Sequence, residues 1–345
     1  MAEESALGKP AEKAPPPKDL TKGSITGNLW TLAWPMTIST MVMMIGPVID
    51  MLWIGRLGDS AIAAVGASGT VVMLINSLIM GIFTGLRAMV ARFVGAGDET
   101  LANKVAQQAF ILGVALSLIV AAMGMFLAEP ILRLMNVAPD VVALGATYMR
   151  INLIGIFTMS FTLIAQNIMQ ASGDARTPMK ISIGTKLFHI ALCPFLIFGW
   201  YIFPTLGVTG AALTDVIAQA AAGAIGLWVV FSGRTRLRPT LKNFSFDRNI
   251  IWRIIKIGIP SSLGGIHMNL GNFIFVWFIA PFGTLAVAGH YLIGRMDMFV
   301  IMPALGLGSA AGILAAQNIG AGQPGRAAKT AWIAIGWFSA VMAVF

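Results

Sequence analysis

The sequence predicts an all-α protein that crosses a lipid bilayer many times. Of its 345 residues, 57% are hydrophobic and 11% are charged, whereas a soluble domain carries about 25% charged residues. Apolar runs of about 20 residues, the length that spans a bilayer, recur along the whole chain. We therefore expect a polytopic helical membrane protein with no soluble domain.

Nine apolar helices account for most of the chain. We expect them at residues 28–54, 60–92, 101–127, 140–171, 177–202, 207–232, 250–280, 285–318 and 326–345. Residues 1–26 are polar and rich in lysine and proline, without the apolar core of a signal peptide, so they predict a disordered tail. The loop 233–249 is the most basic connection, and we interpret it as the boundary between two lobes.

Short glycine-rich turns separate the helices. "GRLGD" follows the first helix, "GAGD" the second and "SGDARTP" the fourth, while "GVTGAAL" opens the sixth. In "SGDARTP", Gly173 can adopt a positive φ, and Thr177-Pro178 suits a helix start with proline in the first turn. We interpret this motif as a structural turn between two helices rather than as a catalytic element.

Basic residues are concentrated on one side of the predicted membrane. The even-numbered loops and the tail hold most of the lysines and arginines, whereas the odd-numbered loops hold only Arg56 and Arg133. By the positive-inside rule this pattern places the N-terminus in the cytoplasm, with the protein in the cell (inner or plasma) membrane. Topology thus explains the net charge of +9, and we expect no nucleic-acid partner.

The chain repeats itself with an offset of 225 residues. The matching positions are Pro35 with Pro260, Gly58 with Gly283, Gly81 with Gly306, and "VGAGD" at 94–98 with "IGAGQ" at 319–323. Because the offset covers an even number of helices, both copies have the same orientation. The repeat predicts two lobes related by an axis along the membrane normal, an architecture of transporters. Residues 27–232 form a complete six-helix lobe, and residues 250–345 supply about three helices of a second, so we expect the chain to be truncated at its C-terminus.

Asp50 stands out because it lies inside the first apolar helix. A carboxylate at bilayer depth costs several kcal/mol unless it faces a polar cavity or finds a partner. The alternatives are a structural aspartate that caps a neighbouring helix, or one solvated near the outer surface. The single cysteine, Cys193, lies in an apolar run and excludes a disulfide framework or a zinc site. We expect no metal or organic cofactor.

The turn motifs resemble those of the MATE (multidrug and toxic compound extrusion) transporters. "MQASGDARTPMKISIG" at 169–184 is similar to the family's junction between helices four and five, and the other turns match in the same order, from about residue 28 to the end. The resemblance implies a twelve-helix antiporter with two six-helix lobes. It also implies export of cationic or amphipathic small molecules in exchange for H⁺ or Na⁺, with no enzymatic activity.

The resemblance assigns a role to Asp50. Prokaryotic members carry an aspartate in a similar "D-x-x-x-x-G-x-x-G" context, kept here by Asp50, Gly55 and Gly58, and it takes part in proton or cation coupling. The family's partners differ, because members with this site have Asn and Asp on helix five and Thr on helix six. Here His189 and Cys193 occupy helix five, and Asp215 stands at the Thr position.

Counting along the helices places Asp50 and Asp215 in the outer half of the membrane and His189 near its middle. We predict that the three converge, with Asp50 and Asp215 sharing a proton and His189 as relay or counter-charge. A sodium site that also uses Thr214 is the alternative. For His189 alone, a hydrogen bond to a backbone carbonyl is equally compatible with the sequence, and Cys193 is interpreted as a packing residue.

The second lobe offers weaker candidates. Asn269, Asn272, His290 and Asp297 are candidates to line the substrate cavity, although His290 and Asp297 also fit a structural network between the lobes. Another branch of the family carries a Glu at the position of Met268, so a cation site of that type is not expected. Arg87 and Arg92 are interpreted as snorkelling to the membrane interface.

Three other functions are alternatives to transport by such an antiporter. A flippase for lipid-linked saccharides would need a cationic cavity, and Lys186 is the one deep cation among the first six helices on this interpretation. An intramembrane enzyme is disfavoured because HExxH, GxSxG and DDxxD motifs are absent. A non-functional transporter fragment is the third. We expect a monomer, and the sequence leaves open the substrate, the coupling ion and whether Phe345 is the native C-terminus.

Overall fold

The computed structural model describes residues 19–201, 204–233, 235, 237, 244–282 and 284–343, with some side chains of the seventh and eighth helices left out. Within these residues the chain forms nine α-helices and no strand. They are α1 (Ile25–Ile54), α2 (Asp59–Gly95), α3 (Glu99–Leu134), α4 (Pro139–Ala171), α5 (Arg176–Phe198), α6 (Val208–Phe231), α7 (Arg248–Ile279), α8 (Thr284–Gly320) and α9 (Pro324–Met342). Short 3₁₀ turns, η1 (Gly55–Leu57) and η2 (Ala280–Phe282), follow α1 and α7.

The all-helical, multi-pass prediction is confirmed. Helices α1 to α6 are each long and apolar enough to cross a membrane. The observed ends differ from the predicted ones by a few residues at most positions. The larger differences have local causes: α5 ends at Phe198 because Gly199 adopts a left-handed φ of 69°. Helix α3 continues past Pro130 to Leu134. The missing N–H of a proline so near the helix end removes only one hydrogen bond, so it does not end the helix there.

The segment before α1 is held in place by side-chain bonds. Ser24 caps α1 by accepting from the Gly27 N–H at 3.3 Å. The Asn28 amide donates to the carbonyls of Leu20 and Lys22, at 2.9 and 2.7 Å, and Leu20 itself is buried. Residues 19–24 were expected to belong to a disordered tail, but these bonds fold them onto the bundle. Residues 1–18 of the predicted tail lie outside the described part of the chain.

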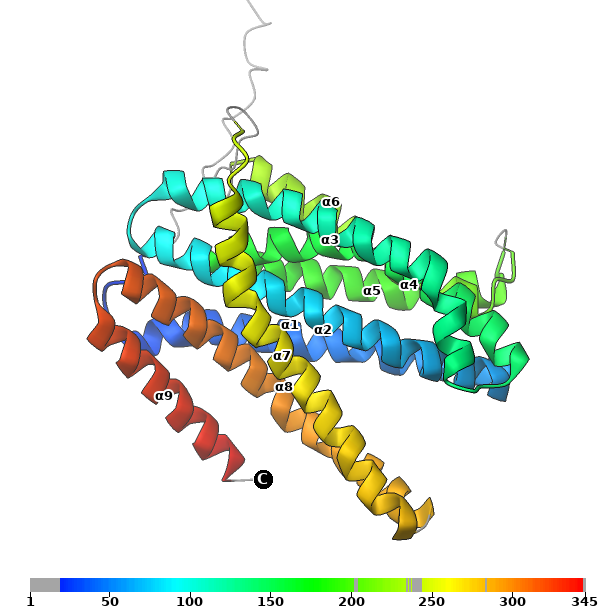
Figure 1. Ribbon diagram of the computed structural model, residues 1–345. Coiled ribbons are helices and arrows are strands. Elements are labelled where there is room, and N and C mark those ends of the chain that lie inside the picture. The colour runs from blue at the N-terminus through cyan, green and yellow to red at the C-terminus, as the bar shows by residue number, and fades with distance from the viewer. Residues whose placement is uncertain are drawn as a thin grey trace, which may run out of the picture.

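The helices form two groups that follow the two predicted lobes (Figure 1). In the first, α4 packs against α2, α3 and α6, while α5 packs against α1 and α6. In the second, α8 packs against α9. The groups meet where α7 lies along α2 and where α8 lies along α1 and α2. The interface between the lobes is therefore built from the first two helices of each repeat.

Two close backbone contacts at this interface are equivalent to each other under the 225-residue offset. A Cβ added to Gly81 on α2 would collide with Ser262 on α7, and a Cβ added to Gly306 on α8 would lie 2.6 Å from the Thr37 Cα on α1. The hydrogen bonds of the two hydroxyl groups follow the same symmetry. Ser262 donates to the Leu78 carbonyl at 2.8 Å, and Thr37 donates to the Pro303 carbonyl at 3.4 Å. The sequence repeat therefore corresponds to a local two-fold axis in the structure, which relates the Gly81–Ser262 contact to the Gly306–Thr37 contact.

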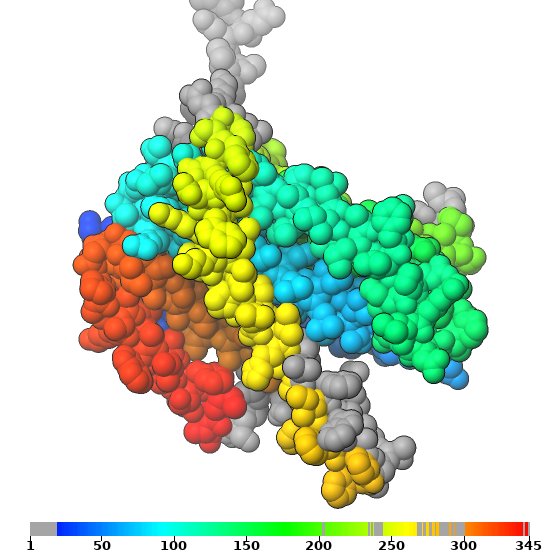
Figure 2. Space-filling model, viewed as in Figure 1, coloured from blue at the N-terminus to red at the C-terminus, as the bar shows by residue number. Residues whose placement is uncertain are grey.

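The lobes touch at one end and separate at the other. A Cβ on Gly95 would strike Gln317, and a Cβ on Gly320 would strike the Arg92 carbonyl, another pair related by the offset. The Gln317 amide also donates to the Ala171 carbonyl at 2.7 Å. At the other end α7 runs away from the first lobe (Figure 2), and Phe275, Phe278 and Phe282 are 59%, 62% and 80% exposed. The result is a wedge that opens towards η1 and η2.

The end of the interlobe loop is fastened to α3. The Gln108 amide donates to the Ser245 carbonyl at 2.8 Å and accepts from the Asp247 N–H at 3.0 Å. The Lys104 ammonium lies 3.0 Å from the Asp247 carboxylate, and Asp247 also caps α7 by accepting from the Asn249 and Ile250 N–H groups. A hydrogen bond from Lys104 lowers the pKa of Asp247 below its usual 3.8.

Replacing Gly81 with Val should destabilise the interface between the lobes by about 1–3 kcal/mol, since the new side chain meets the Ser262 backbone and cannot escape by changing rotamer. Thermal unfolding in detergent measures the loss. Gly66→Val is the matched control, because Gly66 lies on the same helix and a Cβ there meets no heavy atom within 4 Å. Equal melting temperatures for the two variants would contradict the close contact.

Replacing Asp247 with Asn should lower the melting temperature at pH 7 and have no effect in acid. A carboxyl whose folded pKa is depressed stabilises the fold above its unfolded pKa, near 3.8, and this contribution disappears as the pH falls through the lower folded value. Asn still caps a helix, so the change isolates the charge. Asp98→Asn is the control, since Asp98 caps α3 through the Leu101 N–H in the same way. A difference that persisted below pH 3 would contradict the ion pair's role.

Candidate functional site

The candidate site is built from three helices of the first lobe. Asp50 comes from α1, His189 and Cys193 from α5, and Asp215 from α6, and α5 packs against both of the other helices. Pro47 precedes Asp50 and Pro194 follows Cys193. Each proline lacks a backbone N–H and so removes one hydrogen bond from its helix.

The structure brings Asp50, His189 and Asp215 together. The His189 Nε2 lies 3.4 Å from the Asp50 Oδ1 and 3.0 Å from the Asp215 Oδ1. One potential ligand atom from each of the three lies within 4.8 Å of the others. The Cys193 thiol donates to the Asp50 Oδ1 at 3.4 Å. The convergence expected from counting residues along the helices is therefore found, and Cys193 contacts the site instead of only packing beside it.

The imidazole of His189 is fully buried between the two carboxylates. Neither ring nitrogen has an in-line hydrogen bond to the described residues, so the two carboxylate oxygens lie close to Nε2 but off the direction of an N–H bond. The bond to a backbone carbonyl that the sequence allowed is not formed. Two carboxylates a few ångströms apart repel each other when both are ionised, so this arrangement favours holding a proton or a cation between them.

The two carboxylates differ in their access to solvent. The Asp50 side chain is 10% exposed, whereas that of Asp215 is 32% exposed. Asp215 is therefore the more exposed carboxylate of the site and Asp50 the more buried one, with the buried His189 between them. A small apolar cluster covers the side of the site towards η1; its buried members are Ile54, Ala61, Cys193, Ile197, Val208 and Ala211.

Lys186, expected from the sequence only as a deep cation, is a further charged group near the site. It lies one turn before His189 on α5, and the missing side chain of Gly46 on α1 leaves the space that the Lys186 ammonium fills. The spacing of three residues from His189 was the available signal, since positions i and i+3 share a helix face. Thr214, the third ligand of the alternative sodium site, is buried and donates to the Gly210 carbonyl of its own helix at 2.8 Å.

The candidates in the second lobe are less well described. The side chains of Asn269, Asn272 and Asp297 lie outside the described residues, so their predicted place in a substrate cavity stays a prediction. His290 is partly buried, and its ring stacks on Phe275 with centroids 5.4 Å apart and planes 25° apart. His290 thus lies beside Phe275, whose ring is exposed.

Comparisons with known proteins agree on one family. The model of the MatE family matches residues 35–195 and again residues 260–345, so its two matches begin at the predicted offset. The probable multidrug resistance protein YoeA of Bacillus subtilis (strain 168) is 28% identical over 310 residues, which cover 88% of this chain and 66% of that protein. The chain thus spans about two thirds of the length of the curated relatives it matches.

Solved structures share the fold. A transporter of the MOP superfamily from Pyrococcus furiosus superposes with a TM-score of 0.87 at 27% identity, covering 98% of this chain and 74% of that one. An outward-facing multidrug resistance transporter of the MATE family superposes with a TM-score of 0.85 at 26% identity, with the same coverage. Because each superposition covers 98% of this chain, the shared fold includes both groups of helices.

Since the site is enclosed, N-ethylmaleimide should label Cys193 slower, by on the order of tenfold or more, than an exposed cysteine in the same protein. Cys193 is the only cysteine and is fully buried, so mass spectrometry of the intact protein follows one reaction. The control is Leu134→Cys in a Cys193→Ser background, because Leu134 is 87% exposed at the end of α3. Similar labelling rates for the two would contradict the enclosure of the site.

Proposed function

Since the chain belongs to the MatE family, whose model matches most of its length, we propose that it exports small amphipathic or cationic compounds across the cell membrane in exchange for protons. The family consists of transporters, and the chain is a multi-pass membrane protein and not an enzyme. The observation that carries the proposal is the buried Asp50–His189–Asp215 cluster, a carboxylate pair bridged by an imidazole, whose ring nitrogens can accept and donate protons.

In the proposed mechanism a proton enters at Asp215, the more exposed carboxylate. Its neighbour is the His189 Nε2 at 3.0 Å, and the same nitrogen lies 3.4 Å from Asp50. His189 therefore takes the proton from Asp215 and passes it to Asp50 through a single nitrogen. Lys186 lies beside the cluster, and with its ammonium there one proton neutralises the negative charge that remains on the two carboxylates.

The wedge between the lobes supports an outward-facing state. It narrows at the end that carries the basic loops, where Gly95 and Gly320 make their backbone contacts, and it opens towards η1 and η2. With the N-terminus in the cytoplasm, as the positive-inside rule predicts, the open end faces outward. Protons from outside reach Asp215 in this state, and a bound compound leaves as the carboxylates become neutral.

The absence of the family's oxygen-rich set favours protons over sodium. Sodium prefers several oxygen ligands, but here an imidazole lies between the two carboxylates and the Thr214 hydroxyl is bonded within α6. We propose that the protein works as a single chain with H⁺ as the coupling ion and no other cofactor.

Binding of a cationic compound should release protons from this chain. In weakly buffered detergent solution, tetraphenylphosphonium added to the purified protein should acidify the medium, as a pH indicator records. Asp50→Asn and Asp215→Asn should each remove most of this release, because binding and protonation compete for the same carboxylates. In proteoliposomes both variants should also abolish export driven by a pH gradient.

Asp59→Asn is the matched control, because Asp59 begins α2 at an exposed position. Membrane insertion and elution volume should be unchanged in all three variants. Full proton release and full transport in both Asp50→Asn and Asp215→Asn would rule out coupling through the cluster. Export that follows a sodium gradient without a pH gradient would assign the ion as Na⁺ instead.

A further inference from the structure

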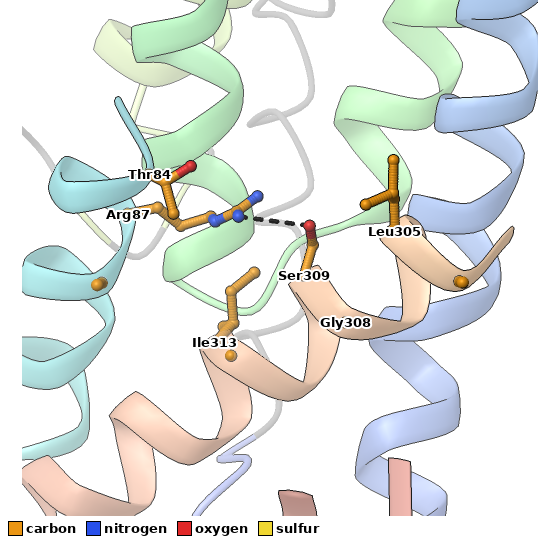
Figure 3. A pocket seen from close by; sticks show the side chains of 9 residues that line it. Thr84, Arg87, Leu305, Gly308, Ser309 and Ile313 are labelled. Carbon is orange, nitrogen blue, oxygen red and sulfur yellow. Dashed lines mark hydrogen bonds between the residues drawn. The ribbon is translucent and has the colours of Figure 1, made fainter. Parts of the chain in front are cut away.

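A second charged group lies within the membrane region, away from the carboxylate cluster. Arg87 of α2 borders a cavity of about 310 Å³ between α2 and α8. Figure 3 shows the Arg87 side chain crossing from α2 towards Ser309 on α8. It does not extend along α2 towards the membrane interface, so the snorkelling interpretation of Arg87 is wrong. The lining also includes Thr84 and a small-residue stretch of α8 with Gly308, Ser309 and Gly312.

The cavity lies at the narrow end of the wedge, near the local two-fold axis. Arg87 is eight residues before Gly95, and Ser309 is eight residues before Gln317, so both lie about 12 Å from the contact that closes this end. The 225-residue offset relates Thr84 to Ser309 and Arg87 to Gly312. The repeat therefore places similar hydroxyl groups on both sides of the cavity and a guanidinium on one side only.

Arg87 is under-satisfied for a guanidinium at this depth. Among the described residues its hydrogen bond is to the Ser309 Oγ, and it is long, 3.4 Å from Nη2. Among the side chains that the structure describes, no carboxylate lies within ion-pair distance of it. A cation in the hydrocarbon region costs several kcal/mol unless it is paired, and such residues are usually functional. Since the described residues offer the guanidinium no other acceptor, its remaining N–H donors can serve a ligand.

Space for a ligand lies directly across from the guanidinium. A Cβ built on Gly308 or Gly312 would meet no heavy atom within 4 Å. The Ser309 hydroxyl accepts from Arg87 and can still donate its own proton to an anion. The Thr84 hydroxyl donates its proton to the Met80 carbonyl at 3.0 Å. Thr84 therefore forms part of the cavity wall but does not supply a hydrogen-bond donor to a ligand. The lining is otherwise apolar, from Ala88, Leu305 and Ile313 among others.

We propose that this cavity binds the carboxylate or phosphate group of an amphipathic anion, held by Arg87 and Ser309 with its apolar part against α2 and α8. Planar guanidinium groups bind these anions through two parallel hydrogen bonds. The proposal goes beyond export of cationic compounds, which Arg87 repels, and it does not depend on proton coupling at Asp50. The anion comes from a soluble compound in the wedge or from the headgroup of an acidic lipid.

Titration calorimetry with phenyl phosphate tests a soluble anion, with phenol as the uncharged control. Native mass spectrometry with phosphatidylglycerol against phosphatidylcholine tests a lipid headgroup. Both use the purified full chain in detergent. Arg87→Gln should weaken binding of the anionic probe at least about tenfold, the loss of one charge-assisted pair. Gly312→Leu should do the same by filling the cavity while keeping the charge.

Arg92→Gln is the matched control, because Arg92 lies on the same helix, carries the same charge and is exposed. It should leave both probes unaffected. Selective binding of phenyl phosphate identifies a soluble anion, and selective binding of phosphatidylglycerol identifies a lipid headgroup. Each of these results supports the proposal when the Arg87→Gln variant no longer binds the probe. Binding of neither probe, or equal binding by Arg87→Gln, Gly312→Leu and Arg92→Gln, overturns it. If Arg87→Gln fails to fold, Gly312→Leu decides alone.

Discussion

The close approach of backbones at glycine is the constraint on which this structure depends. In a bilayer, helices gain nothing from hiding apolar side chains from lipid, so association rests on tight van der Waals packing and on hydrogen bonds between helices. Gly81 and Gly306 provide the packing, and the hydroxyls of Ser262 and Thr37 provide the hydrogen bonds. Because these contacts are repeated by the internal symmetry, the two lobes meet along two equivalent lines with a central space between them.

That geometry separates the two charged sites. The Asp50–His189–Asp215 cluster lies inside one lobe, where α1, α5 and α6 meet, and it is asymmetric because it needs only the first repeat. Arg87 lies between the lobes, beside the axis, where its equivalent position is Gly312. An acidic site within a lobe can change its charge without moving the interface. A basic site at the interface responds to whether the lobes are together or apart.

The sequence predicted the helices and the approximate depth of the charged residues, but not the direction in which each side chain points. Apolar runs and glycine turns fix where helices begin and end, and the rise per residue placed Asp50, Asp215 and His189 close enough to meet.

The direction of the Arg87 side chain was predicted wrongly. A residue near a helix end can point along its helix or across to a neighbour, and for Arg87 the packing of α8 determines which of the two occurs. Lys186 was overlooked as part of the site because its place depends on the missing side chain of Gly46, a contact between two helices. Residues 19–24 were misjudged because their polar composition conceals the bonds that Asn28 makes to their carbonyls.

The contacts at the narrow end determine how the wedge can change. Gly95 and Gly320 bring backbone against backbone, and a hydrogen bond from the Gln317 amide to the Ala171 carbonyl crosses between the lobes beside them. Such a bond contributes about 1 kcal/mol net, so the closed end is held mainly by shape. Packed surfaces of this kind have a few discrete arrangements rather than a continuous range. Opening the narrow end therefore requires α2 and α8 to separate together near Arg87, and an anion bound between Arg87 and Ser309 would oppose that separation by bridging the two helices. On this reasoning the occupancy of the Arg87 cavity and the direction in which the wedge opens are coupled.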